Sequence, residues 1–332
     1  MAPTAAQIKS RALDLGFHKV GIARADALDG EGSAWLSRWL AAGYAGEMGW
    51  MHDPRRRDIR QVLPGVRSVI CVALNYNTPQ GSPAPGQARI SRYALGRDYH
   101  KVLSKPLKAL ARWIEASDPG CRAIAYIDTG PIQEKAWAEA AGIGWIGKNA
   151  CLITLEYGSW VFLGEILSTL DLEADNPHPN YCGTCTRCLS TCPTAALVEP
   201  AVVDARQCLA YHTIENRASE LPEAIAERQH GWVVGCDLCQ TCCPFNLRAE
   251  RWGRYSEVAD FAPRDPWNDI TLDQLTDLSD AEFERWSEGS AIRRVKASGL
   301  RRNARSAVLG APGDSIDLLH ESHQSRKCKL KI

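Results

Sequence analysis

The chain has 332 residues, more than one hydrophobic core usually supports, so two or three domains are expected. Its 39 Lys and Arg residues balance 39 Asp and Glu residues, so the molecule as a whole is not a polycation, and any phosphate-binding surface has to be a local patch. No run of about 18 or more apolar residues occurs, which excludes a spanning helix of ordinary composition.

Residues 1–17 place Ile8 and Leu13 among charged residues, a pattern that predicts an amphipathic helix. The segment lacks the continuous apolar core of a secretory signal peptide. We therefore expect a cytoplasmic protein that does not associate with membranes.

The next segments alternate between β-rich and helical composition. We expect strands over 67–76 and 121–128, a flexible loop over 78–86, a helix over 133–142, and β-rich segments over 151–155 and 159–167. This alternation predicts an α/β or α+β domain over residues 1–172.

Asp128 closes the second of these strands. Thr129 and Gly130 then turn the chain, and Pro131 suits the first position of the helix that follows. A carboxylate at the end of a strand is well placed to face a cleft at the sheet edge. A capping or turn aspartate explains the local pattern as well. If its surroundings are apolar, loss of hydration would raise the pKa of Asp128 and suit it to donate a proton.

The segment GIGWIGKN at 142–149 follows a helix instead of a strand, so it is not a dinucleotide-binding loop. Its glycines would let the backbone approach a large flat cofactor, with Lys148 or Asn149 reaching the polar rim of that cofactor. The alternative is a tight turn with a salt-bridging lysine. Residues 55–60 and 91–100 add basic and aromatic side chains, most of which are expected at the surface.

A polar, proline-rich stretch at 173–180 predicts a domain boundary, and a cysteine-rich domain follows over 173–262. Nine of the 13 cysteines lie between residues 182 and 243. The first run, CGTCTRCLSTCP, has the spacing C-x2-C-x2-C-x3-C-P of bacterial-type ferredoxins. In a reducing compartment such clustering favours metal or cluster ligation over disulfides.

In that ferredoxin spacing, three cysteines bind one 4Fe-4S cluster and the fourth crosses to a second cluster. The second run, CDLCQTCCP, completes the pattern if its first ligand is Cys208, the only cysteine between the runs. Two ligand sets follow: one of Cys182, Cys185, Cys188 and Cys243, and one of Cys192, Cys208, Cys236 and Cys239. Cys242 remains as a bystander, and Cys71, Cys121 and Cys151 are expected in the core. Paired structural zinc sites are the alternative.

Residues 263–332 are expected to be helical, with a helix that opens at Ser279 or Asp280. The segment 293–305 contains six basic residues and no acidic one, which indicates either a phosphate-binding patch or an exposed helix face. The last residues, ending in KCKLKI, are typical of a solvated basic tail.

Taken together, DTGPIQEKAWAEAAGIGWIGKN, CGTCTRCLSTCPTAAL, QCLAYHTIE and GCDLCQTCCPFN resemble the epoxyqueuosine reductases, which are cobalamin- and iron-sulfur-dependent enzymes of tRNA modification. The resemblance extends from EMGWM at 47–51 to about residue 305. It implies an α+β protein: a cobalamin-binding α/β catalytic domain similar to that of reductive dehalogenases at 1–172, a ferredoxin-like domain with two 4Fe-4S clusters at 173–262, and C-terminal HEAT-like helices at 263–332 that are shorter than in many relatives.

The resemblance also implies functional roles. The substrate would be the epoxyqueuosine of a tRNA anticodon stem-loop, reduced to queuosine by electrons that pass through the clusters to cobalamin. Asp128 would correspond to the proton donor of the family. Arg56 and Ser91 fall in segments that line the cobalamin, and His212 is expected to approach the corrin or the substrate base. An electron donor of unknown identity and a monomeric state complete the prediction.

Two rival functions remain at this point. A corrinoid iron-sulfur enzyme similar to reductive dehalogenases would act on a small molecule and need no tRNA. A ferredoxin-type electron-transfer protein would bind no corrin.

Overall fold

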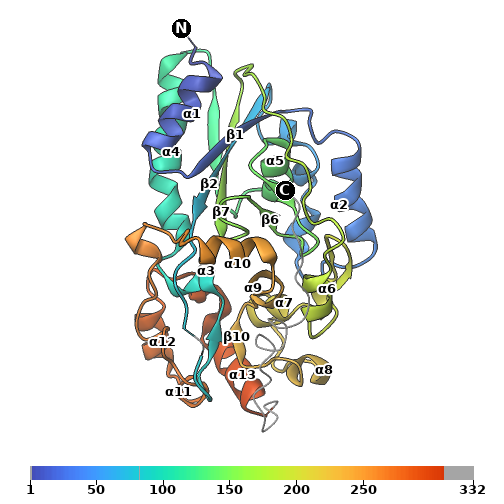
Figure 1. The fold of residues 1–332 in the computed structure, drawn as a ribbon, viewed down its shortest axis with the longest axis vertical. Helices are drawn as coiled ribbons and strands as arrows, with labels where there is room; N and C mark the ends of the chain where they lie inside the picture. The colour runs from blue at the N-terminus through green and yellow to red at the C-terminus, as the bar shows by residue number, and fades with distance from the viewer. Residues whose placement is uncertain (1, 82, 310–332) are drawn as a thin grey trace.

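The computed structural model describes residues 2–81 and 83–309. Figure 1 shows two layers of structure along the long axis, with a β-sheet and its covering helices above, and the cysteine-rich segments and C-terminal helices below. The basic tail predicted at the end of the chain lies outside the described residues.

Four strands form the central sheet, in the order β1-β2-β7-β4 with antiparallel neighbours throughout. Their bounds are β1 Lys19–Arg24, β2 Ser68–Asn75, β4 Ala123–Tyr126 and β7 Val161–Ser168. Every residue of β2 is buried, because helices cover both faces of the sheet. The antiparallel pairing makes the domain α+β, one of the two classes that the sequence predicted.

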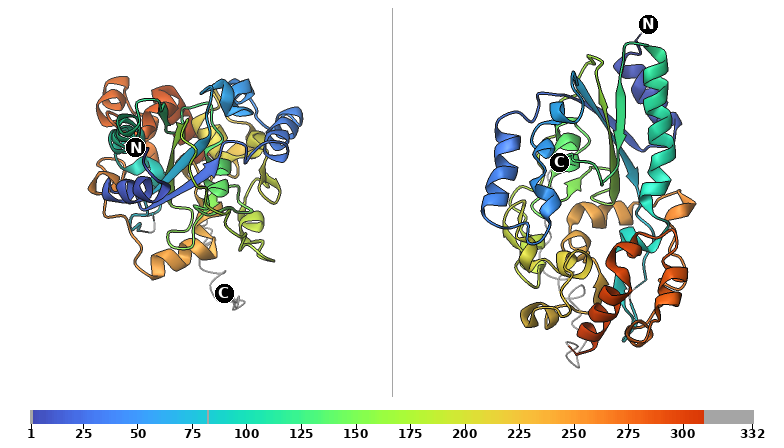
Figure 2. Two further views of the ribbon diagram at one scale, coloured as in Figure 1. Left: turned by 90° about the horizontal axis from the view of Figure 1, so that it is seen from above. Right: turned by 180° about the vertical axis from the view of Figure 1, so that it is seen from behind.

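Helices α1 (Ala5–Asp14) and α4 (Tyr99–Ser117) pack on one face of the sheet, and α5 (Glu134–Ala140) packs on the other (Figure 2). Helix α1 confirms the predicted amphipathic helix, and a capping box between Thr4 and Gln7 begins it. Helix α2 (Glu31–Ala41) lies farther out, where the Trp39 Nε1 donates to the Val203 carbonyl at 2.7 Å.

Apart from α13, the remaining elements are short. They are β3 Arg89–Ile90, α3 Arg92–Leu95, β5 Trp145–Ile146, β6 Leu152–Ile153, α6 Arg187–Thr191, β8 Leu197–Glu199, β9 Val202–Val203, α7 Leu209–Ile214, α8 Glu223–Ala226, β10 Trp232–Val234, α9 Leu238–Thr241, α10 Pro244–Arg251, α11 Leu272–Thr276, α12 Asp280–Trp286 and α13 Lys296–Leu309. Six 3-10 helices join them: η1 Gly49–His52, η2 Pro54–Arg56, η3 Ile59–Gln61, η4 Ala205–Gln207, η5 Ala259–Phe261 and η6 Ala291–Val295. Ser279 caps α12 through a capping box, as its sequence predicted.

One segment of the N-terminal part packs with the C-terminal helices. Strand β3 pairs in parallel with β10, and Ala88, Ile90 and Leu95 share a core with Val233, Val234 and the helices beyond residue 266. The predicted domain ranges therefore overlap in space. Residues 87–95 pack with the C-terminal part, and the chain then returns to the central sheet through α4.

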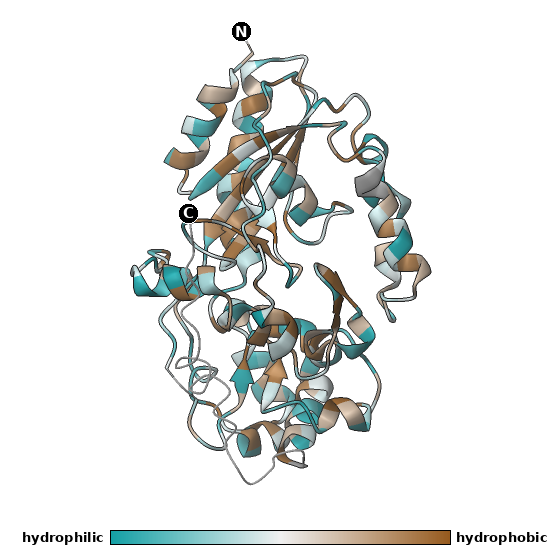
Figure 3. Cartoon of the chain, turned by 45° about the vertical axis from the view of Figure 1, so that its right-hand side comes forward, coloured by the Kyte–Doolittle hydropathy of each residue, from teal (hydrophilic) through white to brown (hydrophobic). Residues whose placement is uncertain are grey.

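Figure 3 shows apolar residues concentrated in the strands of the central sheet, while the outer helices carry both polar and apolar residues. Within the described ranges, none of the helices combines the length and the apolar composition needed to cross a bilayer.

Gly21 allows β1 to pack directly against the end of α5. A Cβ at this position would lie 2.0 Å from the Ala141 carbonyl oxygen, so backbone would have to move. We predict that Gly21→Ala lowers the free energy of unfolding by about 1–3 kcal/mol, measured by chemical denaturation. Gly81→Ala is the matched control, since a Cβ at residue 81 meets nothing within 4 Å. Equal stability of the two variants would contradict this packing argument.

Candidate functional site

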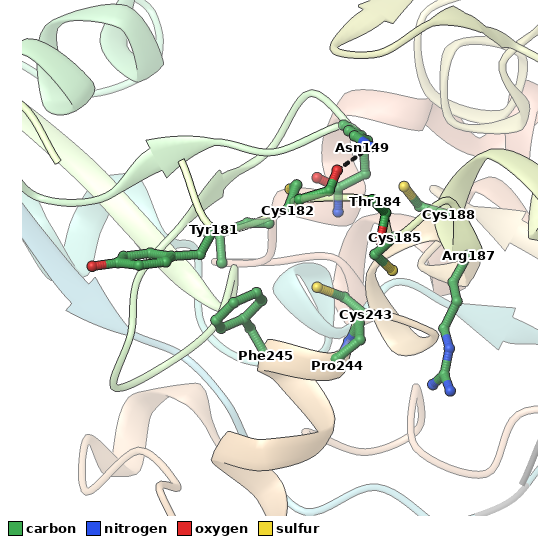
Figure 4. A pocket seen from close by; sticks show the side chains of 13 residues that line it. Asn149, Tyr181, Cys182, Thr184, Cys185, Arg187, Cys188, Cys243, Pro244 and Phe245 are labelled. Atoms are coloured by element: carbon green, nitrogen blue, oxygen red, sulfur yellow. Dashed lines mark hydrogen bonds between the residues drawn. The ribbon is translucent and has the colours of Figure 1, made fainter. Parts of the chain in front are cut away.

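Four cysteine side chains from the two runs surround one cavity of about 310 Å³ (Figure 4). They are Cys182, Cys185, Cys188 and Cys243, the four residues that spacing alone assigned to the first cluster. The same cavity is lined by Lys148, Asn149, Ile153, Tyr181, Gly183, Thr184, Arg187, Pro244 and Phe245. The fold therefore brings the end of the second run to the start of the first run.

Local hydrogen bonds shape this cavity. Asn180 accepts from the Cys182 N–H at 2.9 Å, and the Cys185 N–H donates to the Cys182 carbonyl at 3.0 Å to close a tight turn. Cys243 is the N-cap of α10, with Pro244 in the first turn, which is where proline is tolerated in a helix. The C-P ending thus turns the chain away from the cavity immediately after the last thiol.

The second predicted set is also close together. Burial raises the pKa of Cys236, and the neighbouring Cys208 and Cys192 thiols raise it further. The hydrogen bond with Cys151 and burial raise the pKa of Cys239, and Cys236 and Cys208 raise it further. Such mutual effects require that these thiols lie near one another.

Each set has a fifth thiol beside it. Cys242 lies near Cys185 and Cys188, and Cys151 shares a hydrogen bond with Cys239. Cys71 and Cys121 are buried in the core as expected, but Cys151 is only half-buried and belongs to the edge of the second set. In residues 2–81 and 83–309, no three His, Cys, Asp or Glu side chains converge closely enough to bind a single metal ion.

Asp237 joins the second cysteine run to α3. Its side chain is buried, and its Oδ2 accepts from the Arg92 backbone N–H at 2.8 Å. Burial raises the pKa of Asp237, while the contact with Arg92 and a hydrogen bond from Ser91 oppose that rise. The Arg92 guanidinium lies 4.2 Å from the ring centre of Trp160 and forms a 2.9 Å ion pair with Glu250.

The turn after β4 places Asp128 opposite the first residues of α4. The Oδ2 of Asp128 lies 3.2 Å from the His100 Nε2, and the Tyr99 hydroxyl also hydrogen-bonds to this carboxylate. On its other side, the His100 Nδ1 lies 2.7 Å from Asp98, the N-cap of the helix. Asp128 lies next to a recess that the following residues Thr129 and Pro131 line, and 54% of its own side chain is accessible.

Hydrogen bonding determines where the proton resides in this group. Burial lowers the pKa of His100, but its bonds to Asp128 and Asp98 outweigh burial and raise the pKa to about 9. Burial likewise raises the pKa of Asp128, but bonds from His100 and Tyr99 outweigh it and hold the pKa below its usual range. The sequence predicted a raised Asp128 pKa only for apolar surroundings, and this condition is not met: His100 and Tyr99 surround the carboxylate with donors, so that the proton lies on His100 at neutral pH and Asp128 is its ion-pair partner.

A residue from the C-terminal part acts on Asp128. After the hydrogen bonds and charge of His100 and Tyr99, the positive charge of Arg294 also contributes to the low pKa of Asp128, and Arg294 itself forms a 2.6 Å ion pair with Glu215. The electrostatic surroundings of Asp128 therefore include a cation of η6 as well as groups of the sheet domain.

The other residues predicted to contact the cofactor lie at three different places in the structure. Arg56 lies at the Asp128 turn, where its Nη1 donates to the Ile132 carbonyl at 3.1 Å and its charge acts on Asp128. Ser91 is buried beneath the second cysteine run, against Asp237. Lys148 and Asn149 lie instead at the first thiol cavity, where they donate to the Gly183 and Cys239 carbonyls at 2.7 and 3.2 Å.

His212 occupies a core position. Its Nε2 lies 2.7 Å from the Arg206 carbonyl, and its Nδ1 lies 3.0 Å from the Asn216 side chain, so neither ring nitrogen is available to a cofactor or a base. The glycines of 142–149 also serve internal packing, because a Cβ at Gly144 would lie 2.1 Å from the Ile153 carbonyl oxygen.

The basic segment 293–305 is largely paired within the protein. Three of its arginines are in ion pairs: Arg293 with Glu284, Arg294 with Glu215, and Arg301 with Asp280. Arg302 is buried and donates to backbone carbonyls of residues 212–218. A groove of about 720 Å³ beside α13 retains Lys296 and Arg305 among its lining residues. Fewer cations of this segment are therefore left without an internal partner than the residue count indicated.

The two cysteine runs, folded so that four of their thiols surround one cavity, are those of an iron-sulfur redox protein. Family models agree with this class: residues 56–129 match "Epoxyqueuosine reductase QueG, DUF1730", and residues 181–246 match "4Fe-4S double cluster binding domain". A relative from Gloeobacter violaceus, named epoxyqueuosine reductase, is 89% identical over 320 residues, which is 96% of this chain and 100% of the relative. The chain belongs to the epoxyqueuosine reductase family.

Solved structures agree in fold. A crystal structure of epoxyqueuosine reductase with an epoxyqueuosine-modified tRNA-Tyr stem loop is 28% identical, with a TM-score of 0.84 over 92% of this chain and 80% of that chain. A structure of the Bacillus subtilis enzyme, with its catalytic aspartate loop swung out of the active site, is 27% identical, with a TM-score of 0.81 over 92% of this chain and 81% of that chain.

Sequence reasoning missed Tyr99 and His100 as partners of Asp128. The segment RDYH was noted only for its basic and aromatic content, although an aspartate two residues before a histidine is a usable signal of an oriented imidazole. The contact of Asp128 with these residues depends on how α4 packs across the sheet, which no local pattern contains.

The raised pKa of His100 predicts a dependence of stability on pH. Because the pKa is about 9 in the folded protein and about 6.5 when unfolded, the stabilisation is complete below pH 6.5 and is lost as the pH rises through 9. We predict that His100→Gln lowers the melting temperature at pH 6.5 and that the difference from the native protein shrinks above pH 9. A difference that stays constant across this range would contradict the ion-pair assignment.

Proposed function

We propose that this protein reduces epoxyqueuosine to queuosine in the anticodon stem-loop of tRNA, the last step of queuosine synthesis. The observation that carries the proposal is the convergence of four thiols from two separate runs on one cavity, within a chain that is 89% identical to a named epoxyqueuosine reductase. The tRNA stem loop bound in the solved relative supports the same substrate class.

We assign each cluster to one thiol set. Cys182, Cys185, Cys188 and Cys243 would hold the first 4Fe-4S cluster, while Cys192, Cys208, Cys236 and Cys239 would hold the second. The second set lies next to Asp237, which contacts Ser91 and Arg92 of the catalytic part. A one-electron donor would deliver electrons to these clusters, and the protein would act as a monomer.

The residues around the Asp128 turn fit a cobalamin. An open recess of about 630 Å³ beside the turn is lined by Trp50, Arg56, Thr129 and Pro131, which offer an aromatic face, a guanidinium and a hydroxyl to an amide-rimmed macrocycle. Arg56 would approach it from η2, whereas Ser91 is buried against Asp237 and does not line this recess. Bound cobalamin would supply a low-potential cobalt centre able to open the strained epoxide.

The protein's own part in the reaction is to deliver protons. Reduction consumes two electrons and two protons: both carbon-oxygen bonds of the epoxide break, a carbon-carbon double bond forms, and the oxygen leaves as water. Asp128 would pass a proton to the epoxide oxygen, and His100, which carries the proton at neutral pH, would supply Asp128 in turn. Asp98 holds the imidazole in the orientation that this transfer needs.

The C-terminal part would contribute to substrate binding. The charge of Arg294 acts on Asp128, and Lys296 and Arg305 line the groove beside α13. These cations would contact phosphates or bases of the stem-loop that enters between the two parts of the molecule.

The ligand assignment predicts different iron losses for two cysteines of the thiol region, Cys208 and Cys242. Anaerobically reconstituted Cys208→Ala should lose one cluster and fall from about eight irons to about four, because Cys208 completes the second set. Cys242→Ala should keep about eight irons, since it is a bystander thiol. Iron analysis together with the visible spectrum measures both. An equal loss in the two variants would overturn the assignment.

Asp128→Asn is expected to bind both cofactors yet lower turnover at least about 100-fold, because the amide cannot pass on a proton. The assay is mass spectrometry of tRNA nucleosides after incubation with a low-potential reductant, which follows epoxyqueuosine becoming queuosine. Asp14→Asn, at the end of α1, is the matched control and should turn over normally. If the native protein with both cofactors bound leaves epoxyqueuosine unreduced in this assay, the proposed activity is refuted.

A further inference from the structure

Two carboxyl groups, Glu134 and Glu165, lie beside the Asp128 turn. Glu165 is in β7 and is fully buried (0% exposed), in register with Cys71 of β2 and Tyr126 of β4. Glu134 begins α5, is half-buried, and accepts through its Oε1 a hydrogen bond from the Asp128 backbone N–H. Both side-chain oxygens of Glu165 are buried without a hydrogen-bond partner among the described residues, and Glu134 is near enough to affect the pKa of Glu165.

The surroundings do not allow both groups to be ionised. The titratable groups that face the pair are Asp128, His100, Cys71, Tyr99 and Arg56, and the two cations among them already serve Asp128. Burial and then the charge of Asp128 raise the pKa of Glu134 to about 7, and burial together with Glu134 raises the pKa of Glu165 well above its usual range. One proton is therefore held between the two groups at neutral pH, mainly on Glu165.

The backbone of Asp128 needs support. Its φ of 55° is in the left-handed region, which a residue with a side chain adopts only where the surrounding structure compensates for the cost. The hydrogen bond from the Asp128 N–H to Glu134 is such a compensation, and it is strongest when Glu134 is ionised.

We propose that Glu134 and Glu165 are positioning residues, a carboxyl pair with one shared proton that fastens the Asp128 turn in the conformation that reaches the recess. In this pair, protonated Glu165 donates a hydrogen bond to the Glu134 carboxylate, and the same carboxylate accepts a second hydrogen bond from the Asp128 N–H. The proposal rests on the proposed function, because it is the proton transfer by Asp128 that the pair serves. The swung-out aspartate loop of the Bacillus subtilis enzyme shows that in that protein the loop has more than one position, which is the freedom such a pair would restrict.

The pair predicts how pH and mutation act together. As the pH rises past the pKa of Glu165, this group also becomes negatively charged. Its repulsion of Glu134 and Asp128 then weakens the hydrogen bond that holds the Asp128 turn. Glu165→Gln keeps a donor to Glu134 and cannot ionise, so it mimics the protonated pair at every pH. Glu134→Ala removes the acceptor of the Asp128 N–H altogether.

Hydrogen exchange of the Asp128 amide tests the proposal directly. In the reconstituted protein, we expect Glu134→Ala to lower the protection factor of this amide at least about tenfold and kcat by about 10–100-fold, with KM for tRNA changed less than about threefold. Glu165→Gln should retain native protection and most of the native kcat at pH 7, and should not show the alkaline loss of protection that the native protein shows. Protection factors already correct for the intrinsic pH dependence of exchange.

Iron content and melting temperature establish that each variant is folded and loaded. If Glu134→Ala does not fold, Glu134→Gln replaces it, since the amide oxygen accepts a weaker bond and should give an intermediate protection factor. Unchanged protection in the Glu134 variant, or an alkaline loss in Glu165→Gln equal to that of the native protein, would overturn the proposal. Because exchange is measured without substrate, a protein that shows the expected protection but leaves epoxyqueuosine unreduced would refute the activity and not the pair.

Discussion

The rest of the site depends on the buried carboxylate of Asp237. It lies between Cys236 and Cys239 in sequence, and it accepts from the backbone of Arg92, the residue that begins α3. A buried carboxylate is costly unless hydrogen bonds satisfy it, so the cysteine run and the start of α3 are held at a fixed separation. Helix α3 leads directly into α4, whose first residues contact Asp128. A displacement of the cysteine run would thus be transmitted to the residues that contact Asp128.

The charged groups around Asp128 are paired with one another. His100 lies between two aspartates, Arg294 is paired with Glu215, and Glu134 lies beside the buried Glu165 and raises its pKa. In the ion pairs, each group has a partner that opposes the effect of burial, so protonation follows the hydrogen bonds more than the depth of the residue. Such an arrangement keeps a partly open site charged and ordered before any ligand arrives, which reduces the reorganisation needed during reaction.

Local sequence predicted much of this structure, and the failures have a common cause. The strand at 67–76, the helix at 133–142 and the cap at Ser279 depend on residues close in the chain, and all three are present. The thiol sets followed from ferredoxin spacing, and the structure places the first set around one cavity. The position of Cys151, the partners of Asp128 and the burial of Glu165 depend on strand register and on the packing of α4. Those are contacts between distant segments, which spacing and composition do not encode.

The parallel pairing of β3 with β10 has a consequence for how such enzymes arise. Because residues 87–95 supply a strand and apolar side chains to the core of the C-terminal half, neither half has a complete interior without the other. A ferredoxin unit could not have been attached to a finished catalytic domain, or exchanged for another, without leaving a strand edge and an apolar surface exposed. Lineages of this architecture are therefore expected to inherit both halves as one piece and to vary by insertion at the loops, not by shuffling of modules.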